Sequence, residues 1–140
     1  MPTEYLLLGR LTYAMIEQSL KSALERITGM NVYPLLLPDT ELEGVTFQRI
    51  SDPEIETGLV RTNLIDCRFQ ITIHLIDDYT RLVVLDAAIW AEWKKVVHGY
   101  IDGYPIQYVR RGGVQQGVTT LTNNSKHFWF SRDFILSFKE

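Results

Sequence analysis

The stretch DCRFQITIHLI, residues 66–76, alternates between polar and apolar side chains as far as Leu75. Successive side chains of a strand point to opposite faces, so this alternation predicts a long strand with one buried and one wet face. The buried face holds Cys67, Phe69, Ile71, Ile73 and Leu75, and the wet face holds Asp66, Arg68, Gln70, Thr72 and His74. The stretch therefore predicts a central strand of a sheet that is covered on one side.

An amphipathic helix is predicted directly after this strand, from about Thr80 to His98. Its apolar side chains recur at helical spacing, which packs the helix against the buried face of the sheet. This apolar stripe consists of Leu82, Leu85, Ile89, Trp93, Val96 and Val97. Asp77 or Asp78 is expected to cap the first turn, and His98 to complement the helix dipole at the last. Strand and helix together predict a two-layer α+β unit.

The flanking segments extend this unit to the element order α-β-β-α-β-β. An opening helix is expected at residues 10–28, with Gly29 ending it, followed by an extended apolar connector because Pro34 and Pro38 prevent a helix. Strands are expected at residues 45–51, 106–110 and 127–138, an exposed arm at residues 52–63, and a flexible, mildly basic loop at residues 111–126. Arg132 interrupts the apolar face of the last strand, so we expect a bulge or an edge position to turn it to solvent.

These elements predict the fold class. We expect a single domain, residues 1–140, in which a mainly antiparallel four-stranded sheet carries two helices packed on one face. A length of 140 residues with 46% hydrophobic content is enough to bury one core.

Charge and cysteine content narrow the functional classes. The formal net charge of −3 argues against a general nucleic-acid binder, which needs excess Lys and Arg. The one cysteine, Cys67, lies on the apolar strand face and is expected to be a buried, inert thiol suited to a reducing cytoplasm. The N-terminal segment has neither the basic region nor the long apolar stretch of a signal peptide or membrane span.

No catalytic, cofactor-binding or metal-binding residues are predicted. His74, His98 and His127 have no ligand spacing, although His74 and His127 would approach each other if their strands pair, and an ordinary surface pair is then favoured over a metal site. Residues 110–113, Arg-Arg-Gly-Gly, lack the pattern and the following helix of a phosphate loop.

The expected order of elements resembles that of the tail terminator, or tail completion, proteins of long-tailed phages and prophages. The resemblance is carried by Val32-Tyr33-Pro34 with Pro38 after the first helix and by the strand Val45–Ser51. It continues through the alternating strand, Asp77-Asp78-Tyr79-Thr80 with its helix, and a terminal strand containing Phe128–Phe134. The segment Met1–Gly9 departs from the family, because no counterpart to it can be placed.

This resemblance implies a structural protein and not an enzyme. The family forms a ring, usually a hexamer, at the head-proximal end of the tail tube, where it ends tube growth and gives the head-tail connector a surface to bind. The implied partners are therefore other copies of this chain, the tube protein and the connector. DNA would pass through the ring, and neither sequence-specific nucleic-acid binding nor membrane binding is implied. The implied location is the bacterial cytoplasm during assembly and then the virion tail. The expected interface residues are Asp52, Glu54, Glu56, Arg61, Arg68, Trp90, Arg110, Arg111 and Lys126.

Two rivals come from other functional classes. A small cytosolic ligand-binding or enzymatic domain would need a pocket near residues 110–126 with converging polar groups. An RNA-binding sheet would need exposed aromatic residues and a basic surface. The wet face of this strand instead carries Arg68, Gln70, Thr72 and His74.

Overall fold

The computed structural model describes residues 15–140, and this part of the chain contains two helices and six strands. The segment Met1–Gly9 and residues 10–14 of the expected opening helix lie outside the described residues. In chain order the elements are α1 (Ile16–Thr28), β1 (Val32–Pro34), β2 (Gly44–Ser51), β3 (Leu64–Ile76), α2 (Tyr79–Trp93), β4 (Val97–Ile101), β5 (Tyr104–Thr120) and β6 (Lys126–Lys139). Between residues 15 and 140, no helix has the length and apolar character needed to span a membrane.

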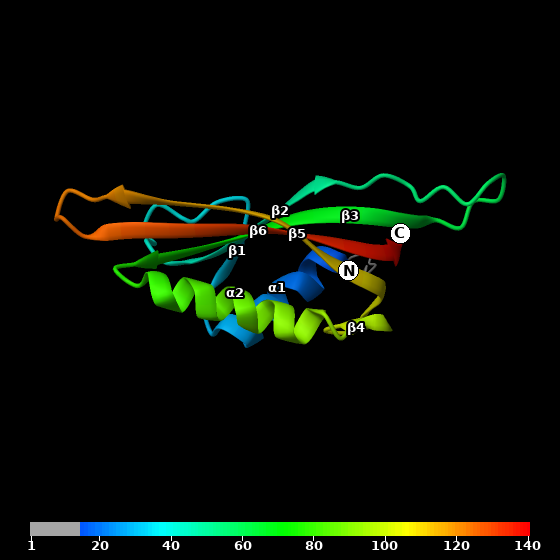
Figure 1. Ribbon diagram of the computed structural model, residues 1–140, viewed down its shortest axis with the longest axis horizontal. Coiled ribbons are helices and arrows are strands. Elements are labelled where there is room, and N and C mark those ends of the chain that lie inside the picture. The colour runs from blue at the N-terminus through cyan, green and yellow to red at the C-terminus, as the bar shows by residue number, and fades with distance from the viewer. Residues whose placement is uncertain (1–14) are drawn as a thin grey trace, which may run out of the picture.

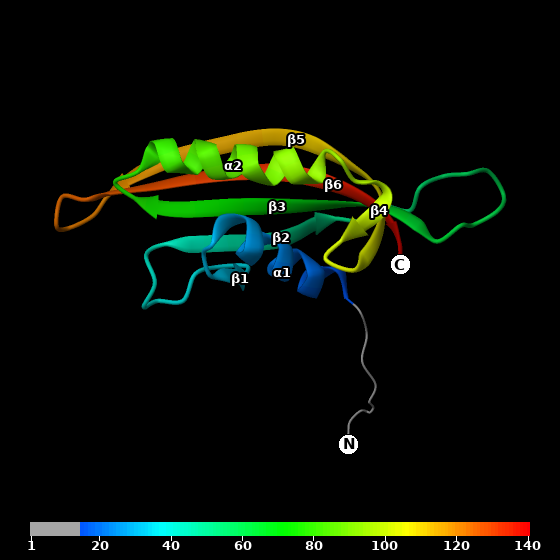
Figure 2. The same ribbon diagram turned by 90° about the horizontal axis from the view of Figure 1, so that it is seen from below.

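The six described strands form one curled, mixed sheet in the order β1-β2-β3-β6-β5-β4. β1 runs parallel to β2, and the other neighbouring strands are antiparallel. Figures 1 and 2 show both helices on the same side of the sheet, with α1 beneath β1 and β2 and α2 beneath β3 and β6. The expected four-stranded antiparallel sheet with the order α-β-β-α-β-β is therefore wrong, whereas two helices on one face is what the structure has.

Two segments account for the two additional strands. Residues 32–34, expected only as a connector, form the edge strand β1, where a proline is tolerated because no ladder bond is needed on the free side. The second helix ends at Trp93 instead of His98, and the β-branched pair Val96 and Val97 leads into β4. His98 consequently lies in β4, where its Nδ1 contacts the side chain of Gln107, and does not serve the helix dipole.

The expected loop at residues 111–126 is wrong for most of its length, because β5 continues to Thr120 along β6. The three glycines of this segment lie within β5. One extra residue is accommodated between Arg111 and Val114, which forms a bulge at the two glycines of residues 112–113. Only residues 121–125 remain as the turn of a long β5–β6 hairpin.

The alternation of residues 66–75 is confirmed in β3. Its predicted inner side chains are buried against the helices, while the other face is polar and half-buried. Asp78 caps α2 as expected, because its carboxylate accepts a hydrogen bond from the Arg81 backbone N–H at 3.1 Å. The core between sheet and helices is built around Leu20, Leu24, Phe69, Ile71, Trp93, Phe134 and Phe138.

Arg132 does not turn to solvent. β6 pairs with β3 without a bulge, so Arg132 stays on the helix-facing side opposite Ile71. Its guanidinium makes two hydrogen bonds to the carboxylate of Asp86 on α2, at 3.2 and 3.0 Å, and a third to the carbonyl of Gly112 in the β5 bulge. The side chains of Arg132 and Asp86 are only 16% and 9% exposed. Each charge has lost most of its hydration, and the attraction of the other charge compensates for that loss.

This ion pair predicts an asymmetric mutational response. Asp86→Ala leaves the Arg132 guanidinium buried without its anion and should lower the free energy of unfolding by about 3–5 kcal/mol, measured by chemical denaturation. The double variant Asp86→Leu with Arg132→Met should recover most of that loss. Lys21→Ala, which breaks the exposed pair with Glu25, serves as the control and should change stability by less than about 0.5 kcal/mol. A small effect of Asp86→Ala would contradict this account.

Candidate functional site

Two segments project from opposite ends of the sheet. Residues 52–63, the arm, lie at one end, and the turn of the β5–β6 hairpin lies at the other, as Figures 1 and 2 both show. The arm leads into β3 and the turn leads into β6, and these two strands are antiparallel. Segments that precede antiparallel neighbours must emerge at opposite ends. The elongated molecule therefore offers two separate ends for contacts.

The base of the arm is tied to the rest of the chain. Arg49 of β2 contacts the carboxylates of Glu17 on α1 at 2.9 Å, Asp52 at 3.1 Å and Glu140 at 3.0 Å. A β-bridge between Glu54 and Ile65 continues this support into the arm. Of the predicted interface residues, Asp52 and Glu54 thus lie at the base of the arm, and Glu56 and Arg61 lie further out along it.

The hairpin presents an unpaired strand edge. β4 pairs with β5 only as far as Tyr108, so residues 109–120 of β5 have no strand on their outer side within the described chain. Lys126 lies at the hairpin's turn, where its ammonium donates to Thr120 Oγ1. Asp77 braces the same turn, since its carboxylate accepts from the Lys126 backbone N–H at 2.7 Å.

The indole of Trp129 packs over Gly117, where a larger residue would leave no room for the ring. An added Cβ at Gly117 would lie 2.5–2.8 Å from atoms of the Trp129 indole, so the ring occupies the place of a side chain. An aromatic residue opposite a strand glycine covers the backbone that the glycine exposes.

The other predicted interface residues are paired within the chain. Arg68 contacts Asp133 at 3.1 Å and Arg110 contacts Asp66 at 3.0 Å, both on the sheet face opposite the helices, which we call the outer face. These two arginines line one recess together. On the helix-facing side, the guanidinium of Arg111 lies 5.3 Å from the ring centre of Trp90. The structure therefore brings the central residues together in pairs and keeps Lys126 at one end of the molecule, away from the arm.

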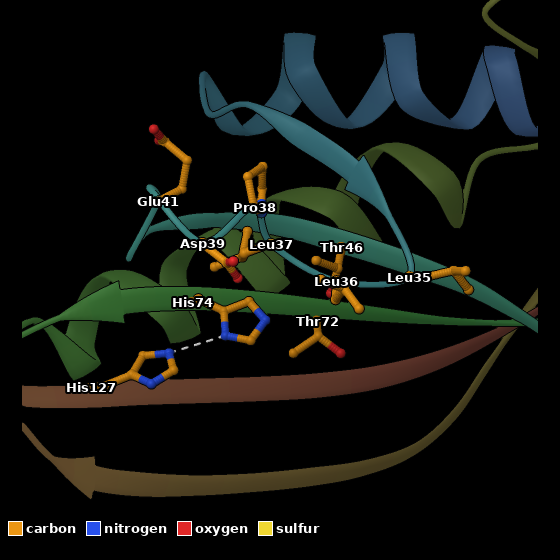
Figure 3. A pocket seen from close by; sticks show the side chains of 10 residues that line it. All are labelled: Leu35, Leu36, Leu37, Pro38, Asp39, Glu41, Thr46, Thr72, His74 and His127. Carbon is orange, nitrogen blue, oxygen red and sulfur yellow. Dashed lines mark hydrogen bonds between the residues drawn. The ribbon is translucent and has the colours of Figure 1, made fainter.

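The sequence analysis missed a pocket on the outer face. The segment after β1 runs along this face and borders an open depression of about 440 Å³. Figure 3 shows its lining, which comes from this segment, β2, β3 and β6: Leu35, Leu36, Leu37, Pro38, Asp39, Glu41, Thr46, Thr72, His74 and His127. The three leucines lie between two prolines and cannot form a helix, but Leu35 and Leu36 remain 66% and 69% exposed, so this run was not a clear sequence signal for the pocket.

His74 and His127 meet in this pocket, as their strands' pairing allows. His74 Nδ1 and His127 Nε2 are 3.0 Å apart (Figure 3), and the ring centres are 5.2 Å apart with planes inclined by 21°. The ring centres are farther apart than the two nitrogens by about one ring radius for each ring, as expected when both nitrogens lie on the line between the centres. The rings therefore meet edge to edge through an N–H···N hydrogen bond and are not stacked face to face.

This geometry favours a hydrogen-bonded pair over a metal site. One of the two facing nitrogens carries the proton, and the lone pair of the other points at it. The two nitrogens therefore do not converge on a third position where a metal ion would sit. Among the described residues, no three His, Cys, Asp or Glu side chains are grouped in a way that could hold a metal ion.

Burial shifts the pKa values of His74 and Cys67 by disfavouring their charged forms. Burial, together with the neighbouring His127, lowers the pKa of His74 to about 4. Burial raises the pKa of the Cys67 thiol to about 12, which agrees with the expectation of a buried, inert thiol.

Comparison with known proteins informs the fold. No protein-family model and no curated protein matches this chain. Solved structures do match, and one of them covers 91% of this chain and 94% of its own with a TM-score of 0.50 and 11% identity. Its name is only a sequence identifier, so the likeness shows that a similar fold has been solved and says nothing of function.

The contact between Gly117 and Trp129 makes a direct prediction. Gly117→Ala should force the indole out of its place and lower the free energy of unfolding by about 1–3 kcal/mol, as overpacking does. The displaced ring should change the near-UV circular dichroism of the protein. Gly113→Ala is the matched control, because a Cβ there meets nothing within 4 Å. Equal behaviour of the two variants would show that Trp129 does not depend on Gly117.

The lowered pKa of His74 predicts a pH dependence of stability. A free imidazole titrates near 6.5 whereas His74 does so near 4, so the unfolded chain takes up the proton first and stability falls as the pH drops from 6.5 to 4. His74→Gln should make this decline shallower, by up to about 1.4 kcal/mol per pH unit, in denaturation series at several pH values. The unaltered protein, measured in the same series, is the reference for this slope. An unaltered slope in His74→Gln would contradict this assignment.

Proposed function

We propose that this chain is a tail terminator subunit that forms a ring, most simply a hexamer, at the head-proximal end of a phage or prophage tail tube. The ring would end tube polymerisation and present the joining surface for the head. No chemical turnover is involved. The partners are other copies of this chain, the tube protein and the head-tail connector, and the protein acts in the bacterial cytoplasm and then in the virion tail.

The observation that carries this proposal is the placement of the arm and the hairpin at opposite ends of the sheet. A subunit of a cyclic ring needs two different contact surfaces, one for each neighbour, because head-to-tail contacts close only when unlike surfaces meet. The resemblance of the quoted sequence segments supports the tail context, although the expected element order was wrong, and the two opposite ends would allow a ring to close.

The rival small-molecule function loses its expected location, because residues 110–120 belong to a strand and not to a loop over a site. The pocket beside the His pair lies elsewhere, on the outer face. Its two histidines are bonded to each other, so their facing nitrogens are already used.

The proposal predicts a specific effect on tubes. The protein should be added to the polymerising tube protein from the genome that encodes this chain, and tube lengths measured by electron microscopy. Tubes should stop growing at one end and carry a ring there, and light scattering should give a mass of about six 16.2 kDa subunits for the ring. Tubes that grow to the same length with and without the protein would reject the proposal.

A further inference from the structure

Part of β5 is a long strand edge that lacks the usual protection against pairing. Strands at the edge of a sheet are normally short or carry charged residues or proline, because their unpaired N–H and C=O groups attract another strand. The edge strand β1 has three residues and ends at Pro34, and β4 has five. Residues 112–120 of β5, in contrast, lie beyond the end of β4 and contain neither a proline nor a charged residue. Within the described chain this edge is open to a further strand.

Exposed apolar side chains lie beside this edge on the helix-facing side of the sheet. Val114 lies opposite Arg132 of β6, which contacts α2, so the side chain of Val114 points to that side. Val118, four residues further along the strand, points the same way. The two valines are 46% and 55% exposed, and Tyr79 of α2 donates to the side chain of Gln116 between them at 2.7 Å. Apolar side chains beside an open edge favour a partner that covers both.

The sequence of this edge is complementary to itself. In an antiparallel pair with a two-fold axis at Gln116, Val114 of each copy lies opposite Val118 of the other. Apolar side chains that lie directly opposite each other pack together. Residues 112–120 bring no charges into the pair, and the Arg111 side chains of the two copies lie at its opposite ends. The matched register and the absence of repulsion identify the partner strand as the same segment of a second copy.

We propose that residues 112–120 of β5 pair antiparallel with the same residues of a second copy, which joins two sheets into one. The contact uses the same surface on both copies, so it ends with a pair. The inference goes beyond the proposed function and does not rest on it, because closing a ring needs two unlike surfaces and this contact needs only one.

Engineered cysteines test the register of this pair. Gln116→Cys places the introduced residues of two copies directly opposite each other, with Cα atoms about 4.5–5.5 Å apart, which is within reach of a disulfide. Mild oxidation should therefore give a covalent dimer on a non-reducing gel. Thr119→Cys is the matched control, because Thr119 lies opposite Gly113 in this register and its two thiols would be about 20 Å apart along the strands. The native Cys67 is buried and should not react.

Paired charges test the same register without a covalent bond. Val114→Lys with Val118→Lys places like charges opposite each other and should weaken pairing at least about tenfold in sedimentation velocity. Val114→Lys with Val118→Glu places opposite charges together and should pair more tightly than the first variant. Both positions are exposed, so folding should persist, and circular dichroism verifies it. Leu59→Lys with Val60→Lys, at exposed positions of the arm, is the control and should pair as the unaltered protein does.

The outcomes separate the inference from the proposed function. Equal cross-linking of Gln116→Cys and Thr119→Cys, or no disulfide in Gln116→Cys, would overturn the edge contact. Equal pairing of the two charged variants would also overturn it, and so would an unaltered protein that forms no pair at millimolar concentration. The proposed function is judged by the capping of tubes, which does not require this contact.

Discussion

The pairing of β3 with β6 is the constraint on which the rest of this structure depends. It runs from Leu64 opposite Lys139 to Ile76 opposite His127 without an irregularity. Because side chains alternate with a period of two, a slip by one residue would move the aromatic set of β6 to the wet face. Keeping that set buried fixes Arg132 on the inside. The ion pair with Asp86 is the consequence, since a buried charge with an anion and a carbonyl as partners costs less than exposing several aromatic rings.

The same pairing determines which groups lie at the ends of the sheet and which lie between them. It places His74 beside His127, and it sends the arm and the hairpin turn to opposite ends. In the middle of the outer face, Arg68 and Arg110 are already neutralised by Asp133 and Asp66. A charge satisfied within its own chain contributes little to binding, because a new partner must first replace the existing pair. These two arginines are therefore a poor source of binding energy for a partner.

Local pattern predicted the strand at residues 66–76 and its neighbours, but the expected four-stranded sheet was wrong, and the errors lie where pairing with a neighbouring strand determines the structure. The alternation of residues 66–75, the arm and the capping by Asp78 were read correctly because each depends on residues close in sequence. Residues 111–120 were predicted as a loop from their glycines, but pairing with β6 makes them a strand. The outer-face pocket was missed because its lining combines the segment after β1 with β3 and β6, and no local pattern shows where that segment lands.

In the proposed ring, each subunit would need only a weak contact at each of its two ends. An isolated Leu59 in water gains nothing from its position, and the polar arm around it would be as soluble without it. Burial of one or two such side chains gives only a weak contact, since most of the gain offsets the loss of rotational and translational freedom. A ring changes this balance, because each subunit is held from both sides and the last contact closes without a further loss of that kind. Weak contacts at two opposite ends are therefore sufficient for a closed ring, while a pair of subunits held by a single such contact separates readily.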